Sequence, residues 1–136
     1  MHAASLEIAT HGIAFYDLSS ELQRVVRESG VEDGLAVVFV RHTSASLVIQ
    51  ENADPRVQDD LLAFFARLVP ENDPIYTHDD EGPDDMPSHV RAALTHTSEV
   101  IPVGGGRALL GTWQGLYLFE HRRAPHRRRV EVRVFS

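Results

Sequence analysis

The sequence predicts an α+β protein: a mixed or antiparallel β-sandwich with two to three helices in a single domain, residues 1–136. Three observations support this prediction. Apolar and polar residues alternate near both ends of the chain, which is typical of half-buried strands. Between the ends, apolar residues recur at helical spacing in separate segments, and no linker or internal repeat divides the chain. Because strands and helices do not alternate one by one, the order favours a sandwich over a wound parallel sheet.

The first thirty residues predict a strand hairpin and a helix. Residues 5–10 and 13–18, with Gly12 between them, are typical of two strands joined by a turn. Apolar residues then recur every three or four positions, and Gly30 is a typical helix stop. We therefore expect a helix near residues 19–29.

The next segment predicts two strands and a second helix. Residues 34–41 are almost continuously apolar and rich in valine, which predicts a strand buried on both faces, and residues 43–50 follow as another strand. Asp54 followed by Pro55 is a typical helix start, and an apolar stripe continues until shortly before Pro70. The stripe consists of Val57, Leu61, Phe64, Phe65 and Leu68.

The rest of the chain predicts an acidic loop, a short helix and three strands. Residues 70–86 are too polar for the core, and loops of this length are usually functional or disordered. Pro87 opens a short helix that extends to about Thr95. Three segments rich in strand-forming residues complete the chain: 100–103, 107–121 and 130–134. The predicted order is two strands, a helix, two strands, one or two helices and three strands.

The composition excludes several kinds of chemistry. The chain has no cysteine and all 13 basic side chains are arginine, so disulfides, thiolate nucleophiles and lysine Schiff bases are excluded. A net charge of -7 argues against nucleic-acid binding, because an acidic surface repels the phosphate backbone. The apolar runs are too short to span a membrane and no signal pattern opens the chain, so we expect a soluble cytoplasmic protein without a membrane partner.

A first candidate site surrounds the junction of the two strands predicted before the second helix. His42 and Ser44 lie at this junction, and Glu51 and Asn52 follow the second strand. These side chains are expected to point toward a shared edge of the sheet. A nucleophilic role for Ser44 is not supported, because no Gly-x-Ser-x-Gly motif surrounds it and a neighbouring histidine does not define a triad.

A second candidate site is the segment THDDEGPDDMPSH. His78 and His89 bracket five carboxylates, and a folded loop would return His78 to face His89 in the first turn of the predicted helix. Imidazole nitrogen and carboxylate oxygen are typical ligands of zinc, manganese or iron, and a spare carboxylate can orient a ligating histidine. The alternative is a solvated acidic loop, because the spacing matches no compact zinc motif.

A third candidate site is the segment GTWQGLYLFEHR, residues 111–122. The simplest interpretation places Trp113 in the core of a strand with its apolar neighbours. Glycines on both sides of an aromatic residue also permit close approach of a ring-shaped ligand, whose edge Gln114 would then hydrogen-bond. The arginines that follow are candidates for phosphate binding, although most are expected in a solvated turn.

Four segments taken together resemble the YjbQ-like family, whose members are described as secondary thiamine-phosphate synthases. They are HTSASLVIQENADP, YTHDDEGPDDMPSH, IPV and GTWQGLYLFEHR, in this order. The resemblance covers about residues 41–129 and implies an α+β fold with a β-sandwich, a homotrimer and a site near subunit boundaries. It also implies a divalent metal, zinc first with magnesium or manganese as alternatives, bound by His42, His78 and His89.

The resemblance further implies a weak transferase activity that joins a pyrimidine pyrophosphate to a thiazole phosphate. In this interpretation Glu51 or Asp85 accepts a proton or orients a ligand, and His121 or Arg122 contacts phosphate. The other expected substrate-binding residues are Ser44, Asn52, Trp113 and Gln114, of which the last two would hold a ring. Two alternatives stay open: a non-catalytic trimer that binds a metal or metabolite, and a metal-dependent phosphohydrolase.

Overall fold

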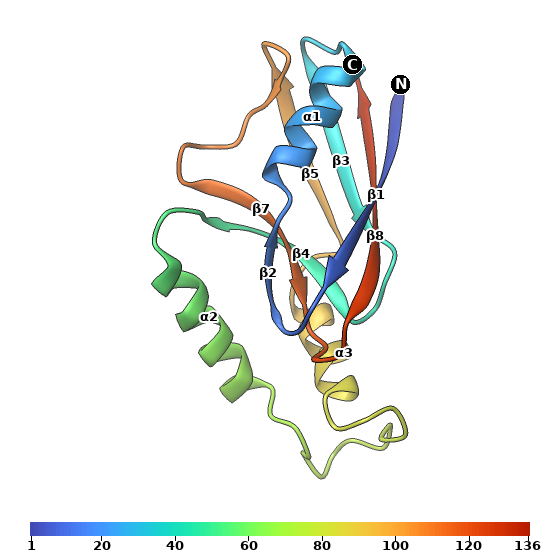
Figure 1. Ribbon diagram of the computed structural model, residues 1–136, viewed down its shortest axis with the longest axis vertical. Helices are drawn as coiled ribbons and strands as arrows, with labels where there is room; N and C mark the ends of the chain where they lie inside the picture. Colours follow the sequence, from blue (N-terminus) through green and yellow to red (C-terminus); the bar gives the residue numbers. More distant parts are fainter.

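The computed structural model describes residues 1–136 and confirms the α+β class, with three helices and two antiparallel sheets (Figure 1). The larger sheet contains, in spatial order, β1 (His2–Thr10), β8 (His126–Phe135), β3 (Gly34–Val40), β5 (Ser98–Gly104) and β6 (Arg107–Ala108). The smaller sheet contains β2 (Ala14–Asp17), β7 (Gln114–Glu120) and β4 (Ala45–Glu51). Every strand pairing within the two sheets is antiparallel.

The three helices are α1 (Ser19–Ser29), α2 (Pro55–Leu68) and α3 (Asp85–Leu94). In Figure 1, α1 and both chain termini lie at one end of the molecule and α3 lies at the other, while α2 lies to one side of the sheets. None of the three combines the length and the apolar composition that a membrane-spanning helix requires.

The hydrophobic core lies between the two sheets and under α1. Alternate residues of the larger sheet point inward, so Val38 of β3 and its partner Val132 of β8 are both buried. On α1, Leu22 and Val26 are four residues apart, and this apolar face closes one end of the core. Fully burying an aliphatic side chain of this size stabilises the fold by about 1.5–3 kcal/mol.

Two predictions about the strands differ from the structure. The prediction that residues 34–41 are buried on both faces is wrong, because the smaller sheet covers only one face of the larger sheet. Leu35 and Phe39 on the other face are 39% and 46% exposed. The C-terminal part contains four strands rather than three, because the two residues of β6 pair separately with β5.

Helix α2 begins as predicted, and its one aromatic contact with the core is the edge-on packing of Phe65 against Phe119, with ring centroids 5.4 Å apart. Asp54 Oδ1 accepts a hydrogen bond from the backbone N–H of Arg56 at 3.0 Å, and Pro55 is the first helical residue. No residue of α2 is buried, and Phe64 and Leu68 are 46% and 52% exposed. The apolar stripe of this helix is therefore largely uncovered within one chain.

Candidate functional site

Two histidines and one aspartate come together where the loop after α2 reaches α3. Figure 1 shows the backbone of this loop and of α3. Asp85 and His89 are four residues apart and lie on one face of α3. The Nε2 atoms of His78 and His89 lie 2.7 and 3.2 Å from Asp85 Oδ2. The centroids of the two rings are 5.7 Å apart, so the loop does return His78 to face His89. One carboxylate oxygen therefore faces two imidazole nitrogens.

The orientation of His89 determines which of its nitrogens can bind a cation. Its Nδ1 lies 2.9 Å from the backbone carbonyl oxygen of Thr43, which only accepts hydrogen bonds, so Nδ1 carries a proton and donates it. In neutral His89, the Nε2 lone pair then points at Asp85 Oδ2, which is also electron-rich. This approach is favourable only when a proton or a metal cation lies between the two atoms.

Arg122 fixes the carboxylate of Asp85 from its other side. The Asp85 side chain is 3% exposed, and its Oδ1 accepts a hydrogen bond from Arg122 Nη1 at 2.7 Å. The same guanidinium donates to Asp84 Oδ2 at 3.2 Å and to the carbonyl oxygen of Glu81 at 3.0 Å. All of its nitrogens are thus engaged by the loop and by α3, which leaves Asp85 Oδ2 directed at the histidines.

Charges within the cluster shift two pKa values in opposite directions. The hydrogen bond with Asp85 raises the pKa of His78 by more than burial lowers it. Burial alone would raise the pKa of Asp85, but the hydrogen bond with His78 and the electrostatic interactions with His89 and Arg122 bring it below its ordinary value. The cluster therefore favours an ionised carboxylate beside a positively charged group.

The residues of this cluster fit a divalent metal ion. One ligand atom from each of His78, Asp85 and His89 lies within 4.8 Å of the other two. With metal bonds of about 2.0–2.2 Å, ligand atoms around tetrahedral zinc lie about 3.3 Å apart. The 3.2 Å contact of His89 Nε2 with Asp85 Oδ2 matches that spacing, and the 2.7 Å contact of His78 Nε2 would lengthen by about 0.6 Å to admit the ion. Three protein ligands leave a coordination position free, as in catalytic rather than structural zinc sites.

A buried ion pair between β7 and β8 ties the two sheets together. Glu120 ends β7 and Arg128 lies in β8, and their side chains are 0% and 3% exposed. Arg128 donates from Nε and Nη2 to the two carboxylate oxygens at 2.7 and 2.5 Å, and the hydroxyl of Thr10 donates to Oε1 at 2.5 Å. Burial would raise the pKa of Glu120, but these hydrogen bonds lower it below its ordinary value. The carboxylate therefore stays ionised inside the protein.

His121 follows Glu120 and is completely buried. Its Nε2 lies 2.9 Å from Ser46 Oγ, and the hydroxyl of Thr95 donates to the same serine oxygen at 2.6 Å. Burial, assisted by the charge of Arg91, lowers the pKa of His121 to about 3. The ring is consequently neutral at physiological pH and takes part in a core network that joins β4, α3 and β7.

The depressed pKa of His121 predicts acid sensitivity. The unfolded chain takes up a proton at His121 near pH 6.5 and the folded protein only near pH 3, so stability falls as pH falls through this window. Between pH 6.5 and pH 5 we expect a loss of about 2 kcal/mol from this residue. Urea unfolding of the wild type and of His121→Gln, measured across this range, checks the expectation. An equally steep pH dependence in the variant would contradict it.

The sequence-predicted site residues form two groups at opposite ends of β7. In the first group, His42 lies between β3 and β4, where its Nε2 accepts a hydrogen bond from the backbone N–H of Arg129 at 2.7 Å. Burial and the charge of Arg128 lower the pKa of His42. His42 lines a cavity of about 240 Å³ together with His89, but it is not among the converging ligand atoms. Ser44 Oγ accepts a hydrogen bond from Arg128 Nη2 at 3.0 Å.

The second group contains Glu51, Asn52, Trp113 and Gln114. Glu51 pairs with Gln114 in the register of β4 and β7, whereas Glu120 ends β7 beside the first group. Six residue steps along an antiparallel strand span about 20 Å. Within one chain, the second group therefore lies far from the histidines.

Contacts within the second group hold the start of β7. Glu51 Oε2 accepts backbone N–H groups just before α2, at 3.2 and 2.8 Å. The side-chain amide of Asn52 donates to the carbonyl oxygens of Thr112 and Gln114 at 3.2 and 3.3 Å. Trp113 is 65% exposed, so the expectation that it is a core residue is wrong. It precedes β7, and only the later residues of that strand enter the core.

Sequence reasoning missed several groups that support the histidine cluster. The sequence does not indicate that the carbonyl of Thr43 orients His89, because every residue has a backbone carbonyl. Asp84 is one of five acidic residues between His78 and His89, and only its contact with Arg122 distinguishes it. The buried pair of Glu120 and Arg128 had one available signal: a charged residue that ends a continuously apolar strand is usually paired.

Three comparisons with known proteins agree with one another. A family model described as "UPF0047 protein YjbQ-like" matches residues 4–136. The UPF0047 protein sll1880 of Synechocystis sp. is 59% identical over 133 residues, 98% of this chain and 90% of that protein. The UPF0047 protein YjbQ of Escherichia coli O157:H7 is 42% identical over 127 residues, 93% and 91% of the two chains. A crystal structure of an uncharacterized conserved protein of the yjbq/upf0047 family from Clostridium acetobutylicum aligns with a TM-score of 0.87 and 37% identity, covering 99% and 100% of the two chains.

Proposed function

Because the chain belongs to the UPF0047 YjbQ-like family, we propose that it is a metal-dependent enzyme that acts on a phosphorylated small molecule. The reaction we assign first joins a pyrimidine pyrophosphate to a thiazole phosphate, as the sequence resemblance implies. One observation carries the proposal: the Nε2 atoms of His78 and His89 converge on Asp85 Oδ2.

His78, Asp85 and His89 are the residues we assign to the metal, with zinc as the first choice because its ligands are two imidazoles and a carboxylate. A divalent cation there would supply positive charge against the negative charge that develops on a departing pyrophosphate.

The supporting residues have distinct tasks in this proposal. The Thr43 carbonyl keeps the proton of His89 on Nδ1, so its Nε2 remains available as a ligand. Arg122 acts as a positioning residue, because its guanidinium is occupied by Asp84, Asp85 and a loop carbonyl rather than directed outward. The substrate would approach the exposed side of the cluster, where the His78 side chain is 43% exposed.

The test is formation of thiamine phosphate from the two substrates by zinc-loaded protein, with metal content measured on the same samples. We expect the wild type to bind about one zinc per chain and to turn over, and His78→Ala/His89→Ala to lose both properties. His96→Ala is the matched control, since His96 Nδ1 also lies close to a carboxylate, Glu99 Oε1 at 2.5 Å, but outside the cluster. The control is expected to retain metal and turnover.

Other outcomes decide against the proposed reaction in defined ways. Release of inorganic phosphate without the second substrate would favour a phosphohydrolase, in which the metal activates water. Zinc binding with turnover far below the median enzyme rate of about ten per second would favour a non-catalytic metal or metabolite binder. Equal metal content in the wild type and the double variant would remove the histidine cluster as the metal site.

We also propose that the protein is a homotrimer. Two separate apolar surfaces support this assembly. One is the α2 face, formed by Val57, Leu61, Phe64 and Leu68, and the other is the outer sheet face, formed by Leu35, Val37, Phe39, Val100 and Pro102. A closed ring of three subunits joins one surface of each chain to a different surface of the next.

The assembly makes a direct prediction. Phe64→Glu on α2, or Val100→Glu on β5, is expected to convert a trimer to monomers, because each places a charge in an apolar contact. Light scattering of the two variants and the wild type measures the mass. A wild type that is monomeric at all concentrations would overturn the proposal.

A further inference from the structure

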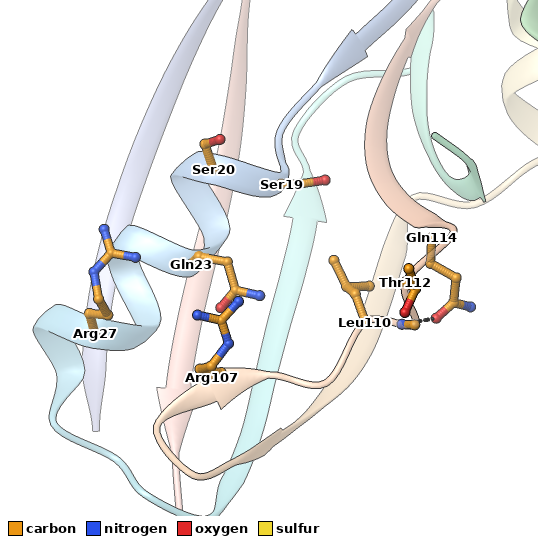
Figure 2. Close-up of a pocket in the computed structure, with 9 residues that line it drawn as sticks. Ser19, Ser20, Gln23, Arg27, Arg107, Leu110, Thr112 and Gln114 are labelled. Carbon is orange, nitrogen blue, oxygen red and sulfur yellow. Dashed lines mark hydrogen bonds between the residues drawn. The ribbon is translucent and has the colours of Figure 1, made fainter. Parts of the chain in front are cut away.

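A second cavity lies between α1 and the segment that leads from β6 to β7 (Figure 2). Its volume of about 600 Å³ is in the range of small-molecule sites. Nine residues line it, of which only Leu110 is hydrophobic and none is acidic. Gln114, which begins β7, belongs to this lining, so the length of β7 separates the cavity from the histidine cluster.

One wall of the cavity is a face of α1. Ser20, Gln23 and Arg27 are three and four residues apart and therefore share this face. The side-chain amide of Gln23 makes two hydrogen bonds with the backbone of Ala108, both of 3.0 Å: Nε2 donates to the carbonyl oxygen, and Oε1 accepts from the N–H. This paired contact fixes α1 to β6 and brings Arg107 beside Gln23, as Figure 2 shows.

The opposite wall is the loop before β7. The backbone N–H of Gly111 donates to Gln114 Oε1 at 2.7 Å, and the N–H of Gln114 donates to the Gly111 carbonyl at 3.0 Å. Asn52 holds the same loop through its hydrogen bond to the Thr112 carbonyl at 3.2 Å. Both walls are thus fixed by hydrogen bonds within the protein, so a ligand need not organise them.

The polar groups that line this cavity are positively charged or neutral. Neither Arg27 nor Arg107 has a carboxylate oxygen within 4.0 Å, whereas Arg24 on the outer side of the same helix pairs with Glu28 at 3.2 Å. The hydroxyls of Ser20 and Thr112 have no hydrogen-bond partner in the protein, and neither does the amide nitrogen of Gln114. The cavity therefore presents two unpaired positive charges, several free donors and no negative charge.

We propose that this cavity binds the phosphate group of a small organic phosphomonoester. Such a group carries nearly two negative charges at neutral pH and accepts hydrogen bonds at three oxygens, which matches two guanidinium groups and the neighbouring donors. Arg27 and Arg107 bind the phosphate from α1 and β6, and Leu110 contacts the organic part. This phosphate site is separate from the histidine cluster and does not depend on the reaction assigned to that cluster.

Titration of ¹⁵N-labelled full-length protein with inorganic phosphate and with phenyl phosphate, at constant ionic strength, tests the site. Saturable shifts are expected at the backbone amides of Ser20, Gly111 and Thr112. Arg107→Gln is expected to weaken phosphate binding about tenfold or more, and Arg27→Gln/Arg107→Gln to abolish it. Arg24→Gln is the matched control, because it removes the same charge from the same helix outside the cavity, and its affinity is expected to stay within about twofold of the wild type.

The result is independent of the metal proposal. His78→Ala/His89→Ala is expected to bind phosphate at this cavity with unchanged affinity, whatever its metal content. Phosphate-induced shifts confined to the residues around Asp85, or a double arginine variant that binds as the wild type does, would overturn the site. An Arg24→Gln variant that binds phosphate as weakly as Arg107→Gln would also overturn the site, because the loss would then follow from the net charge of the protein and not from this cavity.

Discussion

Asp85→Asn is expected to weaken zinc binding by about a hundredfold or more. Asp85 Oδ2 is the atom that both imidazoles approach, and the amide that replaces the carboxylate brings no negative charge to offset a cation. The substitution also replaces the carboxylate whose hydrogen bond raises the pKa of His78, so protons compete less for this imidazole, but that gain is small beside the loss of a ligand. Competition with a chromophoric zinc chelator at fixed pH measures the change.

Asp84→Asn is the matched control for this prediction. Asp84 is the neighbouring carboxylate in the chain, is also buried and also accepts a hydrogen bond from Arg122. It is not one of the converging ligand atoms, so its replacement is expected to change zinc affinity by less than about tenfold. Equal losses in the two variants would mean that acidic surroundings, rather than one specific ligand, account for binding.

Arg128→Met is expected to lower the free energy of unfolding by about 3–5 kcal/mol. The substitution leaves the carboxylate of Glu120 charged and completely buried without its cationic partner. The hydroxyl of Thr10 and two backbone N–H groups still reach this carboxylate, but they do not neutralise it. Urea unfolding at pH 7 measures the loss.

Adding Glu120→Gln to Arg128→Met is expected to restore about half of the lost stability. Glutamine keeps an acceptor for Thr10 and the backbone while removing the buried charge. Arg127→Met is the control one residue away. The Arg127 side chain is 82% exposed and its contact with Glu7, at 3.4 Å, lies in solvent, so this substitution is expected to lower the free energy of unfolding by less than about 1 kcal/mol. Similar losses in Arg127→Met and Arg128→Met would contradict the assignment of the large effect to the buried pair.

Local signals in the sequence predicted the helices better than the sheets. The first helix spans the predicted residues because Gly30, with a φ of 70°, ends it where the sequence indicates. Helix α2 begins at Asp54 and Pro55 for the same kind of local reason. Burial of β3 on one face only depends on where the second sheet lies, and β6 exists only through its pairing with β5. Neither relation is contained in a short stretch of sequence.

The candidate site likewise combines features that the local sequence predicted with features that it did not. The approach of His78 to His89 was predicted from an acidic loop and a proline-started helix, which are local features. The roles of Thr43 and Arg122 in fixing the cluster were not predicted, because they depend on contacts between residues 46 and 37 positions apart. For the same reason the sequence did not indicate that Gln114 and the arginines of α1 and β6 line one cavity.

Strand β7 limits where residues can be inserted into this chain or deleted from it. Its residues from Gly115 to Glu120 are all buried, and its two ends serve the two sites. Deleting a single residue from this strand would rotate every following side chain to the opposite face and draw Glu120 out of reach of Arg128. Insertions or deletions are consequently tolerable at the exposed turn at residues 124–125, but not between the two sites.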